Sequence, residues 1–161
     1  MGVTLLNPLL PPAERFWAKV DKTGDCWLWT AALSRQYGRF YVAGRLVMAH
    51  RFAYELERGE IPAGHELDHR PTCPKRCVNP AHLRPVTHAQ NLQNRPGPNA
   101  NSTSGARGVV WDRKAGKWRA RAKLHGKWHY GGTFDQVPDA EAAAIALRNR
   151  LFTHNDADRT R

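Results

Sequence analysis

Apolar side chains in the first half of the chain recur with two different spacings, and each spacing predicts a different kind of element. In residues 49–58 they return every three or four positions, which predicts an amphipathic helix that stops at Gly59. Aromatic and aliphatic residues fill the short segments 26–30 and 37–42, so we expect strands there. The prolines at 11–12 are expected to open a further short helix.

The second half of the chain shows an alternating pattern instead. Three strands are predicted, at residues 108–111, 118–124 and 127–130. The middle strand alternates Arg119, Arg121 and Lys123 with apolar residues, so one face of the sheet would be cationic and the other apolar. An Ala-rich helix at 138–152 has apolar residues along one side and is expected to pack across the apolar face.

A run rich in Pro, Gly, Asn and Ser separates these two halves. Residues 96–106 carry no periodic apolar pattern, so we interpret them as a linker. The sequence therefore predicts an α+β protein with one module at 1–95 and a second at 107–155. Because a small module buries little core, a structural metal site is expected to stabilise the first one.

The charge of the chain favours a polyanionic partner. Its 161 residues include 25 Lys and Arg against 14 Asp and Glu, a formal net charge of +11. An anionic membrane surface would call for an amphipathic helix with aromatic anchors, which the sequence lacks. No stretch is apolar enough to span a membrane, and the N-terminus lacks the features of a signal peptide. We therefore expect a cytoplasmic protein that binds nucleic acid and no membrane.

The three cysteines are expected to bind a metal ion. They cannot all pair with one another, which favours thiolate ligands in a reducing compartment over disulfides. Cys73, Cys77 and His82 have the spacing of zinc ligands within a loop rich in Pro and basic residues. Cys26 is the expected fourth ligand of a structural zinc site. Three histidines compete with it for that position, namely His50, His65 and His88.

Residues beside this cluster offer chemistry that a structural zinc ion does not need. His69 can take a proton from water, because a histidine pKa of about 6.5 lies near neutral pH. Asp68 and Asn91 carry the oxygen atoms that a hard divalent cation prefers, and such a cation can stabilise the leaving oxygen of a phosphodiester. A capping box at 87–90 predicts a short helix that carries Asn91. Because neighbouring side chains on a strand point to opposite faces, Asp68 and His69 can share a site only at a strand end or bend, which Pro71 favours.

The order of these residues resembles that of the HNH and His-Cys box homing endonucleases, which share the ββα-metal fold. The resemblance implies that His69 is the general base and that Asn91 and Asp68 bind a catalytic magnesium ion. It also implies zinc binding by the cysteine–histidine cluster and cleavage of double-stranded DNA that leaves a 5′ phosphate and a 3′ hydroxyl. Arg51 resembles an arginine that contacts the scissile phosphate in such enzymes. A second zinc site, usual in His-Cys box enzymes, is not expected, since no cysteine follows Cys77.

The second module resembles another family. Its motifs are Arg-Gly-Val at 107–109, Gly-Lys-Trp-Arg-Ala at 116–120, Gly-Thr-Phe at 132–134 and the Ala-rich helix. Residues 103–155 thereby resemble the ethylene-response-factor, Apetala-type DNA-binding domain. The resemblance implies DNA contacts by Arg107, Arg113, Arg119, Arg121, Lys123 and Trp128. It implies a core position for Trp118, and Val110 stands where an Arg is common in that family.

Together these features predict a homing-type DNA endonuclease of phage or intron style, acting in a bacterial or phage-infected host cell. The first module would cut DNA and the second would supply affinity for the target. Two other functions remain open, a phage restriction or packaging nuclease and a non-catalytic, zinc-containing DNA-binding regulator. A regulator would have no use for Asp68, His69 and Asn91 together. The oligomeric state is not decided by the sequence, and a homodimer is compatible with it.

Overall fold

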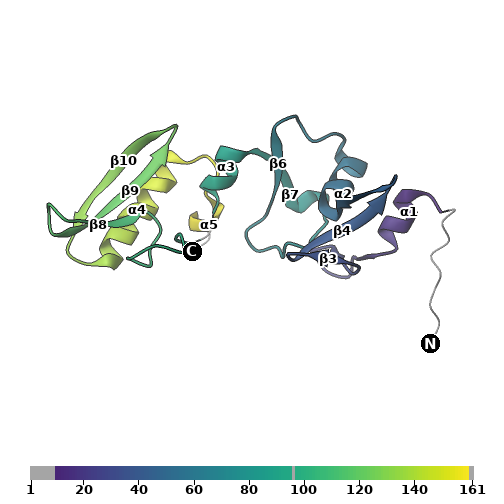
Figure 1. The fold of residues 1–161 in the computed structure, drawn as a ribbon, viewed down its shortest axis with the longest axis horizontal. Helices are drawn as coiled ribbons and strands as arrows, with labels where there is room; N and C mark the ends of the chain where they lie inside the picture. The colour runs from purple at the N-terminus through teal and green to yellow at the C-terminus, as the bar shows by residue number, and fades with distance from the viewer. Residues whose placement is uncertain (1–9, 96, 160–161) are drawn as a thin grey trace. The chain divides into compact units, whose positions relative to one another are not determined.

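The computed structural model describes residues 10–95 and 97–159, in which the chain forms two compact units, Met1–His88 and Ala89–Arg161 (Figure 1). Helices alternate with several small sheets, two of three strands and two of two strands in the described part of the chain. The protein is thus a mixed helix-and-sheet protein, as predicted. The described part of the expected linker, 97–106, belongs to the second unit. The assignment of one nuclease and one DNA-binding module stays a prediction.

The first unit contains short elements, most of which lie where the sequence predicts them. In chain order they are α1 (Pro12–Trp17), β1 (Val20–Asp21), β2 (Leu28–Trp29), β3 (Leu33–Ser34), β4 (Tyr37–Val42), β5 (Arg45–Met48), α2 (Ala49–Arg58), β6 (His65–His69), the 3-10 helix η1 (Pro80–His82) and β7 (Leu83–Thr87). The helix α2 ends at Gly59, whose φ of 87° favours glycine. The strand predicted at 26–30 is reduced to two residues.

An aromatic cluster forms the core of the first unit. Its buried members are Phe16, Trp29, Phe40, Ala49, Ala53 and Val78. The ring centroids of Phe16 lie 5.0 Å from Trp29 and 5.2 Å from Phe40, in contact with both. Gly38 on β4 allows α2 to approach closely, since a Cβ there would lie 2.7 Å from the Cβ of Ala49 and from the Trp29 ring. This packing holds α2 against β4.

A hairpin completes the first unit. Strand β6 pairs antiparallel with β7, and the register places Asp68 opposite Arg84 and His69 opposite Leu83. The helix α3 (His88–Gln93) begins at the residue that follows β7. Two antiparallel strands are therefore followed directly by a helix in the chain.

The second unit has one three-stranded antiparallel sheet with a long helix across one face (Figure 1). Its elements after α3 are β8 (Val109–Asp112), β9 (Lys117–Leu124), β10 (Lys127–Phe134), α4 (Val137–Leu151) and α5 (Asp156–Arg159), with strand order β10-β9-β8. Ala120 and Ala122 of β9 are buried in clusters with Ala140, Ala144 and Leu147 of α4. The alternation expected on the middle strand is confirmed on its apolar side.

In the described residues, no helix combines the length and the apolar character that crossing a membrane requires.

Candidate functional site

Three cysteines and one histidine converge in the first unit. The side-chain ligand atoms of Cys26, Cys73, Cys77 and His82 all lie within 4.8 Å of one another. Nδ1 of His82 lies 3.6 Å, 3.3 Å and 3.7 Å from the three sulfurs in that order. In a tetrahedral site with metal–sulfur bonds of about 2.3 Å, neighbouring ligand atoms are roughly 3.5–3.8 Å apart. The observed separations are close to these values, so the four residues could hold one metal ion such as zinc.

Two distant segments form this cluster because their backbones pair. The backbone amide of Trp29 donates a hydrogen bond to the carbonyl of Arg76 at 3.0 Å. The backbone amide of Val78 donates one to the carbonyl of Trp27 at 2.8 Å. An isolated β-bridge joins Leu28 to Cys77. The segment around 26–30 therefore pairs with β1 on one side and with the cysteine loop on the other, and the second pairing places Cys26 beside the other ligands.

Asn79 stabilises the loop from within. Its amide nitrogen donates to the carbonyl of Asp25 at 2.9 Å, and its side-chain oxygen accepts from the amide of Ala81 at 3.0 Å. The second bond caps η1, the 3-10 helix that ends at His82. Asn79 thus orients the histidine ligand without belonging to the ligand set.

The chemistry of the cluster also suits a metal cation. Burial, followed by the hydrogen bond with Cys26, raises the pKa of the Cys73 thiol to about 12. Burial also raises the pKa of the Cys77 thiol, so both thiols resist ionisation, and a soft cation would make their thiolates favourable. Nε2 of His82 lies 3.3 Å from a carboxylate oxygen of Asp25, which leaves Nδ1 to face the sulfurs. The competing histidines named above lie outside this group.

His69 stands at the end of β6 and is tied to the same cluster. Its Nε2 donates a hydrogen bond to the backbone carbonyl of Cys77 at 3.0 Å, so Nδ1 carries the lone pair. Burial lowers the pKa of His69, and the bond to Cys77 opposes that effect in part. The ring is therefore neutral at neutral pH and has one nitrogen able to accept a proton. One residue, Cys77, serves both the metal cluster and this histidine.

Asp68 is engaged with a cross-strand arginine. The Nη2 atom of Arg84 lies 3.2 Å from Oδ2 of Asp68, whose side chain is 14% exposed. This pair follows from the register of β6 and β7. Sequence reasoning missed Arg84, although its opposite charge in the second strand of a hairpin could have indicated the pair.

His50, which the sequence suggested only as a competing zinc ligand, packs against His69 instead. It lies on α2, is 7% exposed, and its ring centroid is 5.1 Å from that of His69 and 5.5 Å from that of Tyr37. Its buried Nδ1 has no hydrogen-bond partner among the described residues. Burial, with smaller effects of the charges of His69 and Arg51, lowers the pKa of His50 to about 3. His50 therefore packs against His69 as a neutral ring, and Arg51 follows it on α2.

Asn91 lies on α3 and, with the rest of that helix after His88, belongs to the second unit. It is half-buried. The structure thus brings the four predicted zinc ligands together and puts His69 beside them. The predicted cation-binding role of Asn91 stays a prediction.

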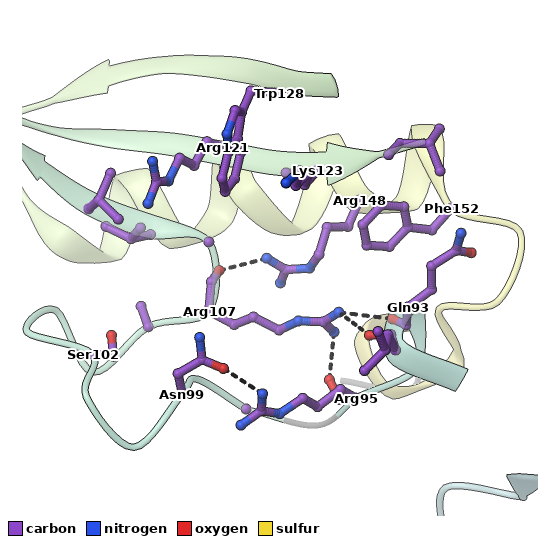
Figure 2. Close-up of a pocket in the computed structure, with 18 of the residues that line it drawn as sticks. Gln93, Arg95, Asn99, Ser102, Arg107, Arg121, Lys123, Trp128, Arg148 and Phe152 are labelled. Atoms are coloured by element: carbon purple, nitrogen blue, oxygen red, sulfur yellow. Dashed lines mark hydrogen bonds between the residues drawn. The ribbon is translucent and has the colours of Figure 1, made fainter. Parts of the chain in front are cut away.

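The cationic side of the second unit carries aromatic as well as basic groups. The Arg121 guanidinium lies 4.2 Å from the centroid of the Trp128 ring, and Nζ of Lys123 lies 5.6 Å from it. Trp128 is 45% exposed. These three residues line a cavity of about 690 Å³, whose lining, within the described part of the chain, includes several arginines and no acidic residue (Figure 2). Arg119, by contrast, is paired with Asp112.

Arg107 contacts the end of α3. Its guanidinium points to the end of α3 and donates hydrogen bonds to backbone carbonyls there (Figure 2). Arg113, by contrast, is an exposed residue in the turn between β8 and β9. DNA contact by either arginine stays a prediction.

Comparison with known proteins identifies one region of the chain. Residues 47–93 match the family model described as HNH endonuclease, and they form an HNH endonuclease domain. The chain is 40% identical over 70 residues to Protein 7.7 of Escherichia phage T7, an alignment that covers 43% of this chain and 53% of that protein. The chain therefore spans about half the length of this relative. No solved structure matches. The matched region contains His50, His69 and Asn91.

Proposed function

We propose that this protein is a homing-type DNA endonuclease that hydrolyses phosphodiester bonds, with His69 as the general base. The observation that carries the proposal is the position of His69 inside the HNH endonuclease domain, as a neutral ring held through one nitrogen. Its Nδ1 takes a proton from the attacking water. The carbonyl of Cys77, which accepts from Nε2, then stabilises the charged ring. The products are a 5′ phosphate and a 3′ hydroxyl.

A divalent cation such as Mg²⁺ would supply charge neutralisation at the leaving oxygen. Asn91 offers an amide oxygen and Asp68 a carboxylate, the ligand types that such a cation prefers. We propose Asn91 and Asp68 as its ligands and Arg51 as a contact to the phosphate. The salt bridge to Arg84 orients the Asp68 carboxylate. The cysteine–histidine cluster would hold zinc as a structural ion, because thiolates favour a soft metal. Stabilising the phosphate oxygens of the substrate calls for a hard cation instead.

The second unit is proposed to bind double-stranded DNA through the cationic face of its sheet. The side chains of Arg121 and Lys123 lie beside the exposed ring of Trp128. The resemblance of this region to the Apetala-type domain also supports DNA binding by this surface. Such a face can neutralise phosphates and contact base edges in a groove. A second binding unit also favours a long target site, as a homing enzyme requires, over a short palindrome.

Plasmid cleavage tests the proposed chemistry. Wild type and His69→Ala are incubated with supercoiled DNA and Mg²⁺, with Mn²⁺ in parallel. His65→Ala, at the other end of β6, is the matched control for removing a histidine. We expect cleavage by wild type and His65→Ala and a loss of about 100-fold or more in His69→Ala. DNA binding without cleavage by wild type, over a range of divalent ions and plasmids, would support the non-catalytic regulator instead.

The length of the recognised site separates the nuclease alternatives. Cleaved molecules are selected from a random-sequence library and sequenced. A long, asymmetric consensus supports a homing enzyme, whereas a short palindrome supports a restriction enzyme. Cleavage without sequence preference supports a packaging nuclease.

A further inference from the structure

The last turn of α3 is fastened to the second unit by the side chain of Arg107. Its guanidinium donates hydrogen bonds to the carbonyl oxygens of Leu92 at 3.2 Å, Gln93 at 3.0 Å and Arg95 at 2.6 Å (Figure 2). The last carbonyls of a helix lack partners inside the helix and form the negative end of its dipole. A cation is therefore favourable at this place. The Arg107 side chain is only 17% exposed, as expected of a group that bonds inward.

Side chains at the end of α3 add further bonds to the same unit. The Gln93 side-chain oxygen accepts from the hydroxyl of Thr153 and from the amide of His154, both at 3.3 Å. The side-chain oxygen of Asn94, a buried residue, accepts from the amide of Ala157 at 3.1 Å. Three separate segments of the second unit therefore hold the end of this helix.

Arg107 is itself positioned by a buried ion pair. Its backbone carbonyl accepts a hydrogen bond of 2.6 Å from Nη1 of Arg148. The Arg148 guanidinium also binds Asp158 through two bonds of 2.5 Å and 3.1 Å, and both residues are buried. Asp158 lies 3.9 Å from the guanidinium of Arg107. The contact to α3 is thus linked to a buried ion pair of the second unit.

We propose that Arg107 is a positioning residue that fixes the end of α3, the helix that carries Asn91. The inference rests on the proposed function, in which Asn91 binds the catalytic cation. It assigns Arg107 a role different from the DNA contact that the sequence suggests. A guanidinium bonded to three carbonyls and close to a carboxylate has few N–H groups left for phosphate.

Single-turnover cleavage at saturating DNA separates positioning from affinity. The variant is Arg107→Ala, and the matched control is Arg150→Ala, which removes an exposed arginine from α4. We expect Arg107→Ala to lower the cleavage rate at saturating DNA by about 100-fold, the loss typical of a misplaced catalytic group, with little change in DNA Kd. We expect Arg150→Ala to cleave as wild type does.

Two further measurements distinguish the loss of the Arg107 contact from a general loss of structure. Val137→Ala removes apolar contact at the other end of α4, so it loosens the core of the unit without touching α3. Hydrogen exchange in the full-length protein should show faster exchange of the α3 amides in Arg107→Ala but not in Val137→Ala. The Mn²⁺ affinity should fall in Arg107→Ala alone.

The outcomes distinguish this inference from the function on which it rests. Wild type that cleaves no DNA refutes the nuclease proposal. Wild type that cleaves, with an Arg107→Ala variant that cleaves equally fast at saturation, refutes the positioning role alone. An equal loss of rate in Val137→Ala and Arg107→Ala would also overturn it, because general destabilisation would then explain both. Unchanged exchange of the α3 amides in Arg107→Ala has the same consequence.

Discussion

The buried ion pair between Arg148 and Asp158 makes the stability of the second unit sensitive to one carboxylate. Substituting Asp158 by Ala leaves the Arg148 guanidinium, whose side chain is 3% exposed, without its charged partner. Among the described residues, Arg148 then keeps its hydrogen bond to the carbonyl of Arg107, which neutralises none of its charge. The perturbation is therefore an uncompensated charge in a closed environment.

Its magnitude follows from that geometry. Breaking a buried ion pair by removing one partner costs about 3–5 kcal/mol. The retained bond to the Arg107 carbonyl favours the lower end, about 3 kcal/mol. For a domain of the size of this unit, that corresponds to a fall in Tm of roughly 12–24 °C. The exposed pair of Lys117 and Asp135 offers a matched comparison, and Asp135→Ala should cost at most about 1 kcal/mol.

The same carboxylate predicts a dependence on pH. Burial raises the pKa of Asp158, but the hydrogen bonds and charge of Arg148 lower it by more, so the net shift is downward. A carboxylate whose folded pKa lies below its unfolded value stabilises the fold above the unfolded pKa, about 4. That stabilisation is lost as the pH falls through the folded pKa. Wild type should therefore lose stability below about pH 4, and Asp158→Ala should lose less of it over this range.

Hydrogen exchange with mass spectrometry is the suitable assay, because it reports residues 89–159 separately from the first unit. Peptides from the sheet and α4 should lose protection in Asp158→Ala, while peptides from the first unit should not change. If Asp158→Ala proves no more destabilising than Asp135→Ala at pH 7, the buried pair does not contribute as argued.

The other predictions concern metal, nuclease residues and DNA. Metal analysis should find close to one zinc ion per chain, lost alike in Cys26→Ser and Cys73→Ser; zinc retained by Cys26→Ser would point to a histidine in its place. His50→Ala should destabilise the first unit by about 1–3 kcal/mol in urea unfolding and slow cleavage, since His69 loses the ring packed against it. Equal cleavage rates of wild type and His50→Ala would show that cleavage does not depend on this packing. Arg121→Ala should weaken DNA binding and lower the slope of log affinity against log salt by about 1; an unchanged slope would exclude a phosphate contact.

Much of the fold was accessible from local patterns. The strand at 37–42 and the helix that ends at Gly59 were predicted where the structure has them, because their apolar spacing and stop signal lie within the segments. The alternation on the strand around Arg121 was likewise readable. The segment 26–30 was readable only in part. Its residues Leu28 and Trp29 pair with the neighbouring strand β1, but its other backbone bonds go to the cysteine loop some fifty residues away, which no local pattern indicates.

The sequence by itself indicated the candidate metal ligands, with one ambiguity, and the candidate base. Cys73, Cys77 and His82 lie close together in one loop, so their short separation in the sequence indicated that they are also close in space. Only the tertiary structure decided that Cys26 joins them, that His50 packs on His69, and which acceptors Arg107 uses. A guanidinium is equally suited to a phosphate, a carboxylate or the end of a helix, and its choice depends on which acceptors long-range packing brings within reach.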